Sequence, residues 1–272
     1  MRTPPTSPIA LASSFWCNRS LILALTKREV IGRYKGSLLG ILWSLFNPIL
    51  MLTVYTFFFS VVFKARWPGG TDSKTEFALI LFSGLLVFNF FSECLGRAPL
   101  MIVGNPNYVK KVVFPLETLS FVLVGAAGFH FLASLLVWLL FYIVFFGAPA
   151  IQVLYLPLVL VPLLLLTLGF IWILASLGVY LRDVAQVVTA VIPALMLLSP
   201  VFFPISALPE SLHLAFQLNP LTFLIEQARG VLIWQQSISW DHWAIQTAFS
   251  AIFAWAGYAW FQKTRKGFAD VL

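Results

Sequence analysis

Residues 153–180 read VLYLPLVLVPLLLLTLGFIWILASLGVY, 28 residues that include no Asp, Glu, Lys or Arg. An α-helix needs about 20 mostly apolar residues to cross the hydrocarbon core of a bilayer. The stretch therefore predicts a membrane-spanning helix. With five further spans, it predicts that residues 1–272 form a single all-α membrane domain with six transmembrane helices. Five further apolar runs predict the other spans, at 38–63, 77–99, 116–146, 184–204 and 241–262.

The composition supports a membrane protein and excludes several other classes. Hydrophobic residues make up 60% of the chain and charged residues 10%, whereas about 25% of the residues in a soluble domain are charged. Two cysteines and three scattered histidines predict neither a disulfide framework nor a metal site. No G-x-x-x-x-G-K-[ST] loop occurs, so no nucleotide or other cofactor is expected in this chain. The net charge is +7, but the basic residues flank the apolar runs, and this placement indicates membrane topology rather than nucleic-acid binding.

The basic residues are distributed unevenly among the connections between the predicted spans. Thirteen of the 17 Lys and Arg residues lie in the N-terminal segment, the 97–111 connection, the turn at Arg182 and the C-terminal tail. The alternate connections hold the remaining four. Cytoplasmic loops of membrane proteins carry the excess of Lys and Arg. Both termini of this multi-pass protein are therefore expected in the cytoplasm.

The segment before the first span predicts a helix at the membrane surface. Its apolar run, residues 21–25, is too short for the core of a signal peptide. Residues 16–36 instead predict a moderately amphipathic helix on the cytoplasmic membrane face, with a frayed basic leader as the alternative. Residues 1–15 are rich in Pro and Ser, and we expect them to be poorly ordered. Gly36 and Gly40 favour a hinge between the surface helix and the first span.

The connection between the fifth and sixth spans, residues 205–239, is apolar but too short for two further spans. Prolines divide it into two short helices, one over about 209–218 and one that begins with Pro220 after a capping Asn219. Irregular backbone at membrane depth requires protein or a water-filled cavity to satisfy its polar groups. The helix pair is therefore either re-entrant and functional or an amphipathic cap on the outer surface.

Charged side chains are rare in the predicted spans. Glu93 and Glu117 lie toward cytoplasmic ends, and Glu226 and Arg229 lie one turn apart in the outer helix pair, where they can form an ion pair. His130 is the one titratable residue well inside a span, and a hydrogen-bonded packing role is favoured over a proton relay. Because ion-coupled carriers need carboxylates near the midplane, the pattern argues against a pump.

The connection between the second and third spans contains GNPNYVKKVVFP, residues 104–115. Asn105 can cap a helix, Pro106 suits its first position, and two lysines suit its last turn. A short helix over residues 105–113 is therefore predicted, which either docks on another protein or is only an interfacial turn. The next cytoplasmic turn contains Arg182–Asp183, to which the residues alone assign no function.

Six short stretches occur in an order that resembles the membrane subunits of polysaccharide ABC exporters, the type-2 permease class. The closest likeness is to the O-antigen export permeases of lipopolysaccharide assembly, which are related to capsule and teichoic-acid exporters. Each stretch alone is a weak signal, but the ordered set covers almost the whole chain. The stretches are LTKREVIGRYKGSLLGILW (25–43), NPNYVKKVVFP (105–115), YLRDV (180–184), SPVFFPISALP (199–209), LNPLT (218–222) and RKGFADVL (265–272).

The resemblance implies a half-transporter that forms a homodimer on two copies of a separate ABC ATPase, which binds ATP and Mg²⁺. The implied substrate is a polyprenyl-diphosphate-linked glycan that crosses the bacterial inner (plasma) membrane. Residues implied to couple the chain to the ATPase are Lys27, Arg28, Arg33, Asn105, Asn107, Tyr108, Lys110, Arg182 and Asp183. Residues implied to form a periplasmic gate in the 205–239 segment and at its start are Pro204, Pro209, Asn219, Pro220, Glu226 and Arg229.

Aromatic residues are the candidate lining of the substrate path. A polar glycan cannot cross hydrocarbon unaided, and the apolar C–H faces of sugars pack against aromatic rings. Tyr55, Phe58 and Phe59 share one side of the first predicted span, and Phe202 and Phe203 end the fifth. The resemblance implies that these two spans line the path. The alternative is that the rings face lipid or the protein core.

Two other functions stay open at this point. One is a permease of the same class for another substrate, such as capsule polymer, teichoic acid, a drug or a small lipid. The other is a membrane-embedded glycan or lipid transferase. The transferase would need an acid–base constellation, and the sequence offers no paired carboxylates or nucleophile–base pair.

Overall fold

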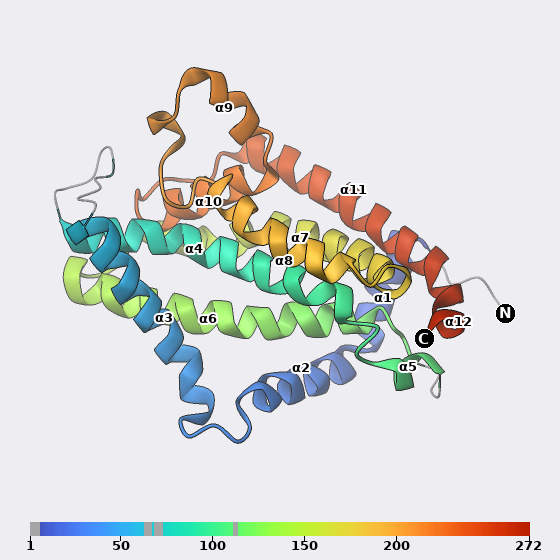
Figure 1. Ribbon diagram of the computed structural model, residues 1–272. Helices are drawn as coiled ribbons and strands as arrows, with labels where there is room; N and C mark the ends of the chain where they lie inside the picture. The colour runs from blue at the N-terminus through green and yellow to red at the C-terminus, as the bar shows by residue number, and fades with distance from the viewer. Residues whose placement is uncertain (1–5, 63–66, 68–72, 111–113) are drawn as a thin grey trace.

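The structure is a computed structural model that describes residues 6–62, 67, 73–110 and 114–272 of the chain. Within these ranges the secondary structure is helical and includes no β-strand, so the all-α class is confirmed. Helices α1 and α12, near the two chain ends, lie at the same end of the molecule, close to α5 (Figure 1). The principal helices are α1 (Pro8–Cys17), α2 (Arg19–Tyr34), α3 (Trp43–Tyr55), η2 (Thr56–Val62), α4 (Lys74–Arg97), η3 (Ala98–Leu100), α5 (Pro106–Lys110), α6 (Thr118–Phe146), α7 (Leu156–Tyr180), α8 (Val184–Leu197), α9 (Glu210–Gln217), α10 (Pro220–Leu232), α11 (Trp240–Thr264) and α12 (Phe268–Val271).

The described residues contain four helical stretches that are long and apolar enough to cross a membrane. A fifth is added only if α1 and α2, which are bent by 67°, are counted as one broken span. The apolar α8 has 14 residues and α11 has 25, so the six-span arrangement stays a prediction. The four stretches are Gly40–Phe59, Thr75–Leu100, Thr118–Phe146 and Ile151–Tyr180.

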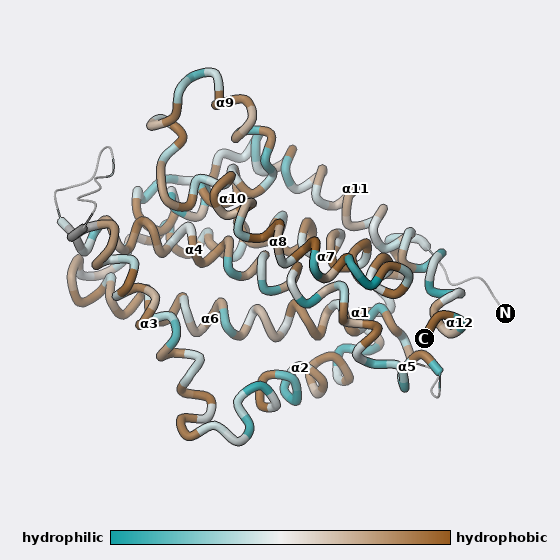
Figure 2. The backbone as a smooth tube through the Cα atoms, viewed as in Figure 1, coloured by the Kyte–Doolittle hydropathy of each residue, from teal (hydrophilic) through white to brown (hydrophobic). Residues whose placement is uncertain are grey.

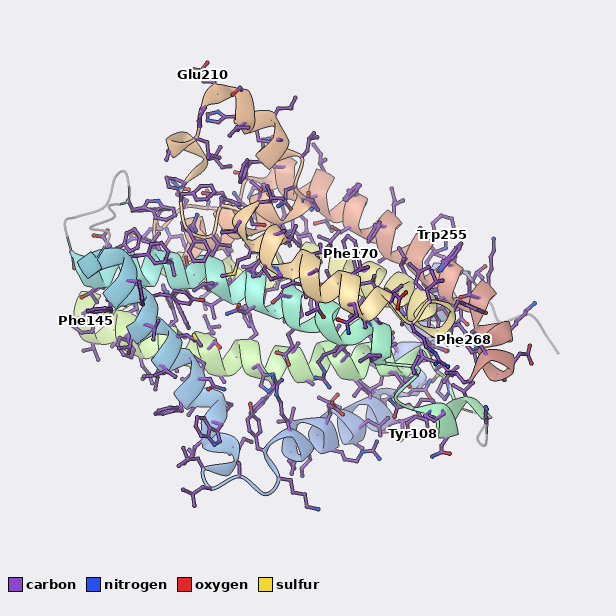
Figure 3. The ribbon with its side chains drawn as sticks, viewed as in Figure 1. Tyr108, Phe145, Phe170, Glu210, Trp255 and Phe268 are labelled. Atoms are coloured by element: carbon purple, nitrogen blue, oxygen red, sulfur yellow. The ribbon has the colours of Figure 1, made fainter. Side chains whose placement is uncertain are left out.

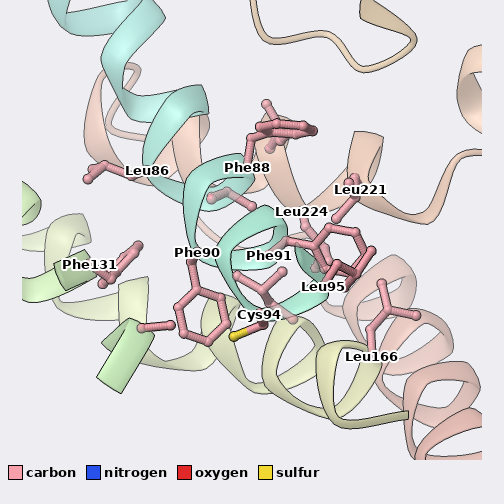
Figure 4. Close-up of a cluster of buried hydrophobic side chains, with 14 of the residues drawn as sticks. Leu86, Phe88, Phe90, Phe91, Cys94, Leu95, Phe131, Leu166, Leu221 and Leu224 are labelled. Atoms are coloured by element: carbon pink, nitrogen blue, oxygen red, sulfur yellow. The ribbon is translucent and has the colours of Figure 1, made fainter. Parts of the chain in front are cut away.

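Helix α4 forms the centre of the bundle and packs against α6, α7, α8 and α10. In Figure 4, Phe91 and Leu95 of α4 lie beside Leu221 and Leu224 of α10, and all four are buried. Within a membrane such side chains stabilise the bundle through van der Waals packing between helices. Hydrophobic residues colour α6, α7 and α8 along their lengths, whereas hydrophilic residues gather on α2 and near α5 (Figure 2). Helix α10 thus contributes buried side chains to the core of the bundle.

Helices α7 and α11 make the most extensive helix contact in the bundle. Glycines permit this close approach, because a Cβ atom at Gly257 would lie 2.5 Å from the carbonyl oxygen of Gly169. Small residues at helix interfaces have the same effect in other membrane proteins, where they let two backbones come together. The pair is joined to α4 through α7, which contacts both helices.

Local signals explain several helix ends. The side-chain oxygen of Asn219 accepts a hydrogen bond from the backbone N–H of Leu221 at 3.0 Å, and Pro220 follows the cap as the sequence predicts. Gly36 and Gly40 have φ angles of +85° and +53°, a conformation that favours glycine. They lie in the turn between α2 and α3, where the sequence predicts a hinge.

The N-terminal segment differs from its prediction in two ways. The sequence predicts poor order through residue 15, but α1 begins at Pro8, because Ser7 caps it and accepts a hydrogen bond from the backbone N–H of Ala10 at 3.2 Å. The single helix expected over residues 16–36 is instead broken at Asn18, where the two helices bend. Residues 1–5 lie outside the described part of the chain.

Two predicted spans also end differently. The first run, 38–63, begins as a short 3₁₀ turn, continues as α3 and ends in the π-helix η2, with Phe63 outside the described residues. The fifth run, 184–204, is helical only to Leu197, and an irregular turn that contains Pro200 completes it. Proline cannot donate the backbone hydrogen bond that a continuing helix requires.

Candidate functional site

Two regions at opposite ends of the bundle hold the residues that the sequence singles out. Tyr108 and Phe268 mark one end in Figure 3, where α1, α5 and α12 gather, and Phe145 marks the other end. We refer to the first as the coupling end and to the second as the outer end. The candidate ATPase contacts lie at the coupling end or on α2.

The predicted 105–113 helix exists as α5, which covers residues 106–110, and residues 111–113 lie outside the described ranges. The Asn105 side chain donates to the carbonyl oxygen of Met101 at 2.9 Å, so its amide secures the preceding turn. The exposed Asn107 and Lys110 point away from the bundle and are available to another protein.

Tyr108 ties α5 to its surroundings. Its ring stacks on Phe114 with a centroid distance of 4.4 Å and an interplanar angle of 11°. Its hydroxyl oxygen accepts a hydrogen bond of 3.0 Å from the guanidinium of Arg28 in α2. The structure thereby joins two of the predicted coupling elements, α2 and α5, through one side chain.

Ion pairs hold α2 against the bundle. Arg33 pairs with Glu93, and Glu29 pairs with Arg97, where Glu93 and Arg97 are both residues of α4. Glu93 also accepts a hydrogen bond from Nδ1 of His130 at 2.9 Å, in line with the packing role expected for that histidine. Glu93 is the most shielded of these charges, with 17% of its side chain exposed, so salt screens its interactions less than those of the more exposed Glu29–Arg97 pair.

Sequence reasoning missed the partners of α2. Arg33 is a predicted ATPase contact, yet its guanidinium is engaged by Glu93. Glu93 and Arg97 are also within reach of each other at i,i+4 spacing, with 3.8 Å between their charged atoms. Two charged residues four positions apart at the end of an apolar run could have indicated a cluster of ion pairs at this end of α4.

The remaining coupling candidates, Lys27, Arg182 and Asp183, lie on the surface. Lys27 is exposed on α2, and Arg182 and Asp183 are exposed at the short turn between α7 and α8. Their side chains face solvent and form no ion pair among the described residues. Their exposure is compatible with contact to another protein.

The aromatic candidates for the substrate path divide into two sets. Phe202 lies 5.2 Å from Phe59, ring centroid to ring centroid, with nearly parallel planes, and 6.2 Å from Tyr55. Phe58 instead contacts Phe57, and Phe203 contacts Phe216. The structure therefore joins three of the five predicted residues in what we call the aromatic cluster, namely Tyr55, Phe59 and Phe202.

The π-helix η2 explains why Phe58 is separated. A shared face for Tyr55, Phe58 and Phe59 requires α-helical spacing through residue 59, but the wider π turns begin at Thr56. Side chains after that point are rotated relative to those of α3. Phe58 is therefore 48% exposed and directed away from Phe202, while Phe59 is half-buried against it.

The outer helix pair is fastened to the end of α8. The amide of Asn219 donates to the carbonyl oxygen of Leu198 and to the hydroxyl of Ser199, each at 3.0 Å. Arg229 and Glu226 form the expected ion pair at 2.8 Å. Of the other gate candidates, Pro209 precedes α9 and Pro204 lies in the turn after α8.

The described residues offer no arrangement typical of an enzyme site. No group of three His, Cys, Asp or Glu side chains in these ranges could hold a metal ion. Three carboxylates of this part of the chain, Glu29, Glu93 and Glu117, are engaged by arginines or by His130. The geometry is that of a helical bundle with an aromatic cluster toward one end and the short, partly exposed helix α5 at the other.

Comparisons with known proteins are consistent with this arrangement. The family described as "ABC-2 type transporter" matches residues 20–233. The O-antigen export system permease protein RfbA of Myxococcus xanthus is 28% identical over 264 residues, which cover 96% of this chain and 99% of that protein. A protein of the same name from Klebsiella pneumoniae is 26% identical over 253 residues, which cover 93% and 95% of the two chains.

Proposed function

Because the chain belongs to the ABC-2 type transporter family, we propose that it is the permease subunit of an ATP-driven exporter of O-antigen type polysaccharide. The substrate is a glycan linked to polyprenyl diphosphate that crosses the bacterial inner membrane. The observation that carries the proposal is the end-to-end likeness to permeases named for O-antigen export. The chain is a transport subunit and not an enzyme.

A permease of this family implies an ABC ATPase as its partner in the membrane transporter. In our proposal the ATPase is a separate chain, present in two copies, and it supplies the ATP and Mg²⁺ sites. The exposed face of α5, with Asn107 and Lys110, receives it together with α2. The hydrogen bond between Arg28 and Tyr108 and the ion pairs of α2 connect this surface to α4, and α2 also packs against α6.

Six spans with both ends in the cytoplasm complete the proposed topology. Helix α11 has 25 residues and a length of about 37 Å, enough for a bilayer core. The 14 residues of α8 reach only about 21 Å, so the turn that follows α8 must span the rest of the bilayer core. The proximity of α1 and α12 at the coupling end supports an even number of spans (Figure 1).

Two copies of the chain are proposed to enclose the glycan between them. Several large apolar side chains of α3, η2 and α8 are exposed in one chain, and a second copy could cover part of this surface. The aromatic cluster lies at this part of the bundle, where its rings can pack against sugar faces. The exposed apolar residues are Phe46, Leu50, Phe57, Phe58, Val187, Val191 and Leu197.

Cysteine labelling tests the topology. In a variant whose Cys17 and Cys94 are replaced by serine, we expect Ser237→Cys to react with an impermeant maleimide added to cells with a permeabilised outer membrane. Lys266→Cys should react only after the inner membrane is opened. Both native residues are exposed, so local burial does not explain a difference. Reaction of both cysteines from the same side would show that α11 does not cross the membrane and would contradict the six-span topology.

Loss and restoration of the gene test the function. We expect deletion to remove O-antigen from the cell surface and to leave lipid-linked glycan at the cytoplasmic face. Restoration should require this chain and an ATPase with an intact phosphate-binding loop together. Normal surface O-antigen in the deletion strain would exclude this substrate. Accumulation of capsule polymer or teichoic acid instead would favour another substrate of the same permease class.

A further inference from the structure

Arg229 is a fully buried cation in α10, with a side-chain exposure of 0%. Its Nη1 donates to Glu226 at 2.8 Å, and its Nη2 donates to the carbonyl oxygens of Pro200 and Val201 at 2.9 and 3.3 Å. The guanidinium carbon lies 4.3 Å from the ring centre of Trp67. A buried charge is retained only where hydrogen bonds and opposite charge satisfy it. This arginine therefore occupies a site built around its guanidinium.

Arg229 donates to backbone carbonyl groups in the turn that follows α8. Helix α8 ends at Leu197, and the turn that follows contains Pro200 and Pro204, which have no N–H to donate. Carbonyl groups in such a turn need partners when they lie away from water. The planar guanidinium of Arg229 reaches two of these carbonyls at once, which the ammonium of lysine does less well.

Helix α4 leaves space for this arrangement at Gly84. A Cβ atom at that position would lie 2.8 Å from Nη2 of Arg229 and 3.6 Å from the Cα atom of Val201. The glycine thus lets α10 and the α8 turn meet on the surface of α4. The packing of Arg229 depends on three segments that are distant in sequence.

The contacts around Arg229 close into a ring that includes the aromatic cluster. Val201, whose carbonyl Arg229 holds, precedes Phe202, and Phe202 stacks on Phe59. Phe59 stacks on Phe77 at 6.2 Å, and Phe77 contacts Trp67 at 6.1 Å. Trp67 in turn lies against the guanidinium. One side chain of α10 therefore holds the aromatic cluster from two sides.

We propose that Arg229 is a positioning residue for export, which joins the outer helix pair to the aromatic cluster so that the two move together. We call Arg229, Trp67 and the turn 199–202 the outer clamp. The inference rests on the proposed function, because it assigns the cluster to the glycan path. When α10 is in place the clamp holds Phe202 against Phe59, and a displacement of α10 releases both Phe202 and Trp67.

The first test replaces the guanidinium. We expect Arg229→Gln to lower surface glycan at least about tenfold per amount of protein–ATPase complex, because the carbonyls and Glu226 lose a common partner. Arg229→Lys should restore part of the export, since it keeps the charge but not the fork. Glycan export equal to the unmodified chain in Arg229→Gln, at equal complex level, would falsify the proposal.

The second test leaves α10 intact and so covers the case in which Arg229 variants do not fold. Trp67→Phe keeps a π-face for the guanidinium and should keep at least about half of the export, whereas Trp67→Leu should lose most of it. Trp240→Leu is the matched control, because Trp240 is 52% exposed at the outer end and contacts Tyr155. Equal export in Trp67→Leu and Trp240→Leu would reject a role for the clamp.

A third readout does not depend on the substrate. Ser199 is fully buried in the clamped turn, so Ser199→Cys in a background without native cysteines should react slowly with an impermeant maleimide. Adding Trp67→Leu should raise this rate about fivefold or more, and adding Trp240→Leu should not. If the unmodified chain exports no glycan, the proposed function fails, while an unchanged labelling rate in the Trp67→Leu background would overturn the clamp itself.

Discussion

The substitution Gly178→Ala is expected to destabilise the protein strongly, although it adds only one methyl group. Gly178 lies in α7, and a Cβ atom on it would be 2.1 Å from the carbonyl oxygen of Pro99 and 2.7 Å from its carbonyl carbon. Both are backbone atoms of η3, so no side-chain rotation relieves the overlap. Inserting a methyl group into such a contact costs about 1–3 kcal/mol or more.

Thermal unfolding of the purified protein in detergent measures this effect. We expect Gly178→Ala to lower the melting temperature by several degrees and to lower the yield of folded protein. Gly128→Ala is the matched control, because no atom lies within 4 Å of a Cβ at that helical position. The control should unfold at the original temperature or slightly above it, since alanine favours a helix by about 1 kcal/mol over glycine. Equal melting temperatures for both variants would contradict the close packing of α7 on η3.

The consequence of this contact extends to the coupling end. The helical turn η3 follows α4 directly and precedes α5 by a few residues. Its backbone is pressed against α7 at Gly178, so α7 determines where the connection to α5 begins. A displaced η3 would shift the whole of α5, with its exposed Asn107 and Lys110, relative to α2. We therefore expect Gly178→Ala to weaken ATPase binding together with stability.

The sequence predicted features that depend on composition or on a few neighbouring residues. Scarce charge and long apolar runs indicate an all-α membrane protein, because lipid excludes exposed backbone polar groups. Asn219 and Pro220 mark the start of α10 through local capping, and Glu226 and Arg229 pair because they lie one turn apart. Both local predictions use interactions between residues that are close neighbours in the chain.

Contacts between distant segments could not be predicted in the same way. The ion pair of Arg33 with Glu93 joins residues 60 positions apart, and Arg229 meets Trp67 across a much larger separation. The π-helix η2 shifted Phe58 away from the aromatic cluster, although the residues themselves satisfy α-helical spacing. Hydropathy also could not distinguish a helix that ends at Leu197 from one that continues to Pro204.

The double substitution Tyr108→Ala with Lys110→Glu should separate the chain from its ATPase. Tyr108 provides the stack on Phe114 and the acceptor for Arg28, so its loss removes both contacts that orient α5. Lys110 is exposed, and its reversal changes the charge that the docking surface presents. We expect co-purification of the ATPase and export of glycan to fall at least about tenfold.

Two further variants distinguish orientation of α5 from a general effect of charge. Tyr108→Phe keeps the stack on Phe114 and loses only the hydrogen bond to Arg28, so it should retain most ATPase binding. Lys263→Glu introduces the same charge change at the coupling end but outside α5, in the last turn of α11, and should lower binding much less than the double variant. If the double variant binds the ATPase normally while reversal of the exposed Lys27 abolishes binding, the surface of α2 and not α5 is the docking site. The tight attachment of α2 to α4 through Glu93 and Arg97 would then transmit the motion of the ATPase to the spans.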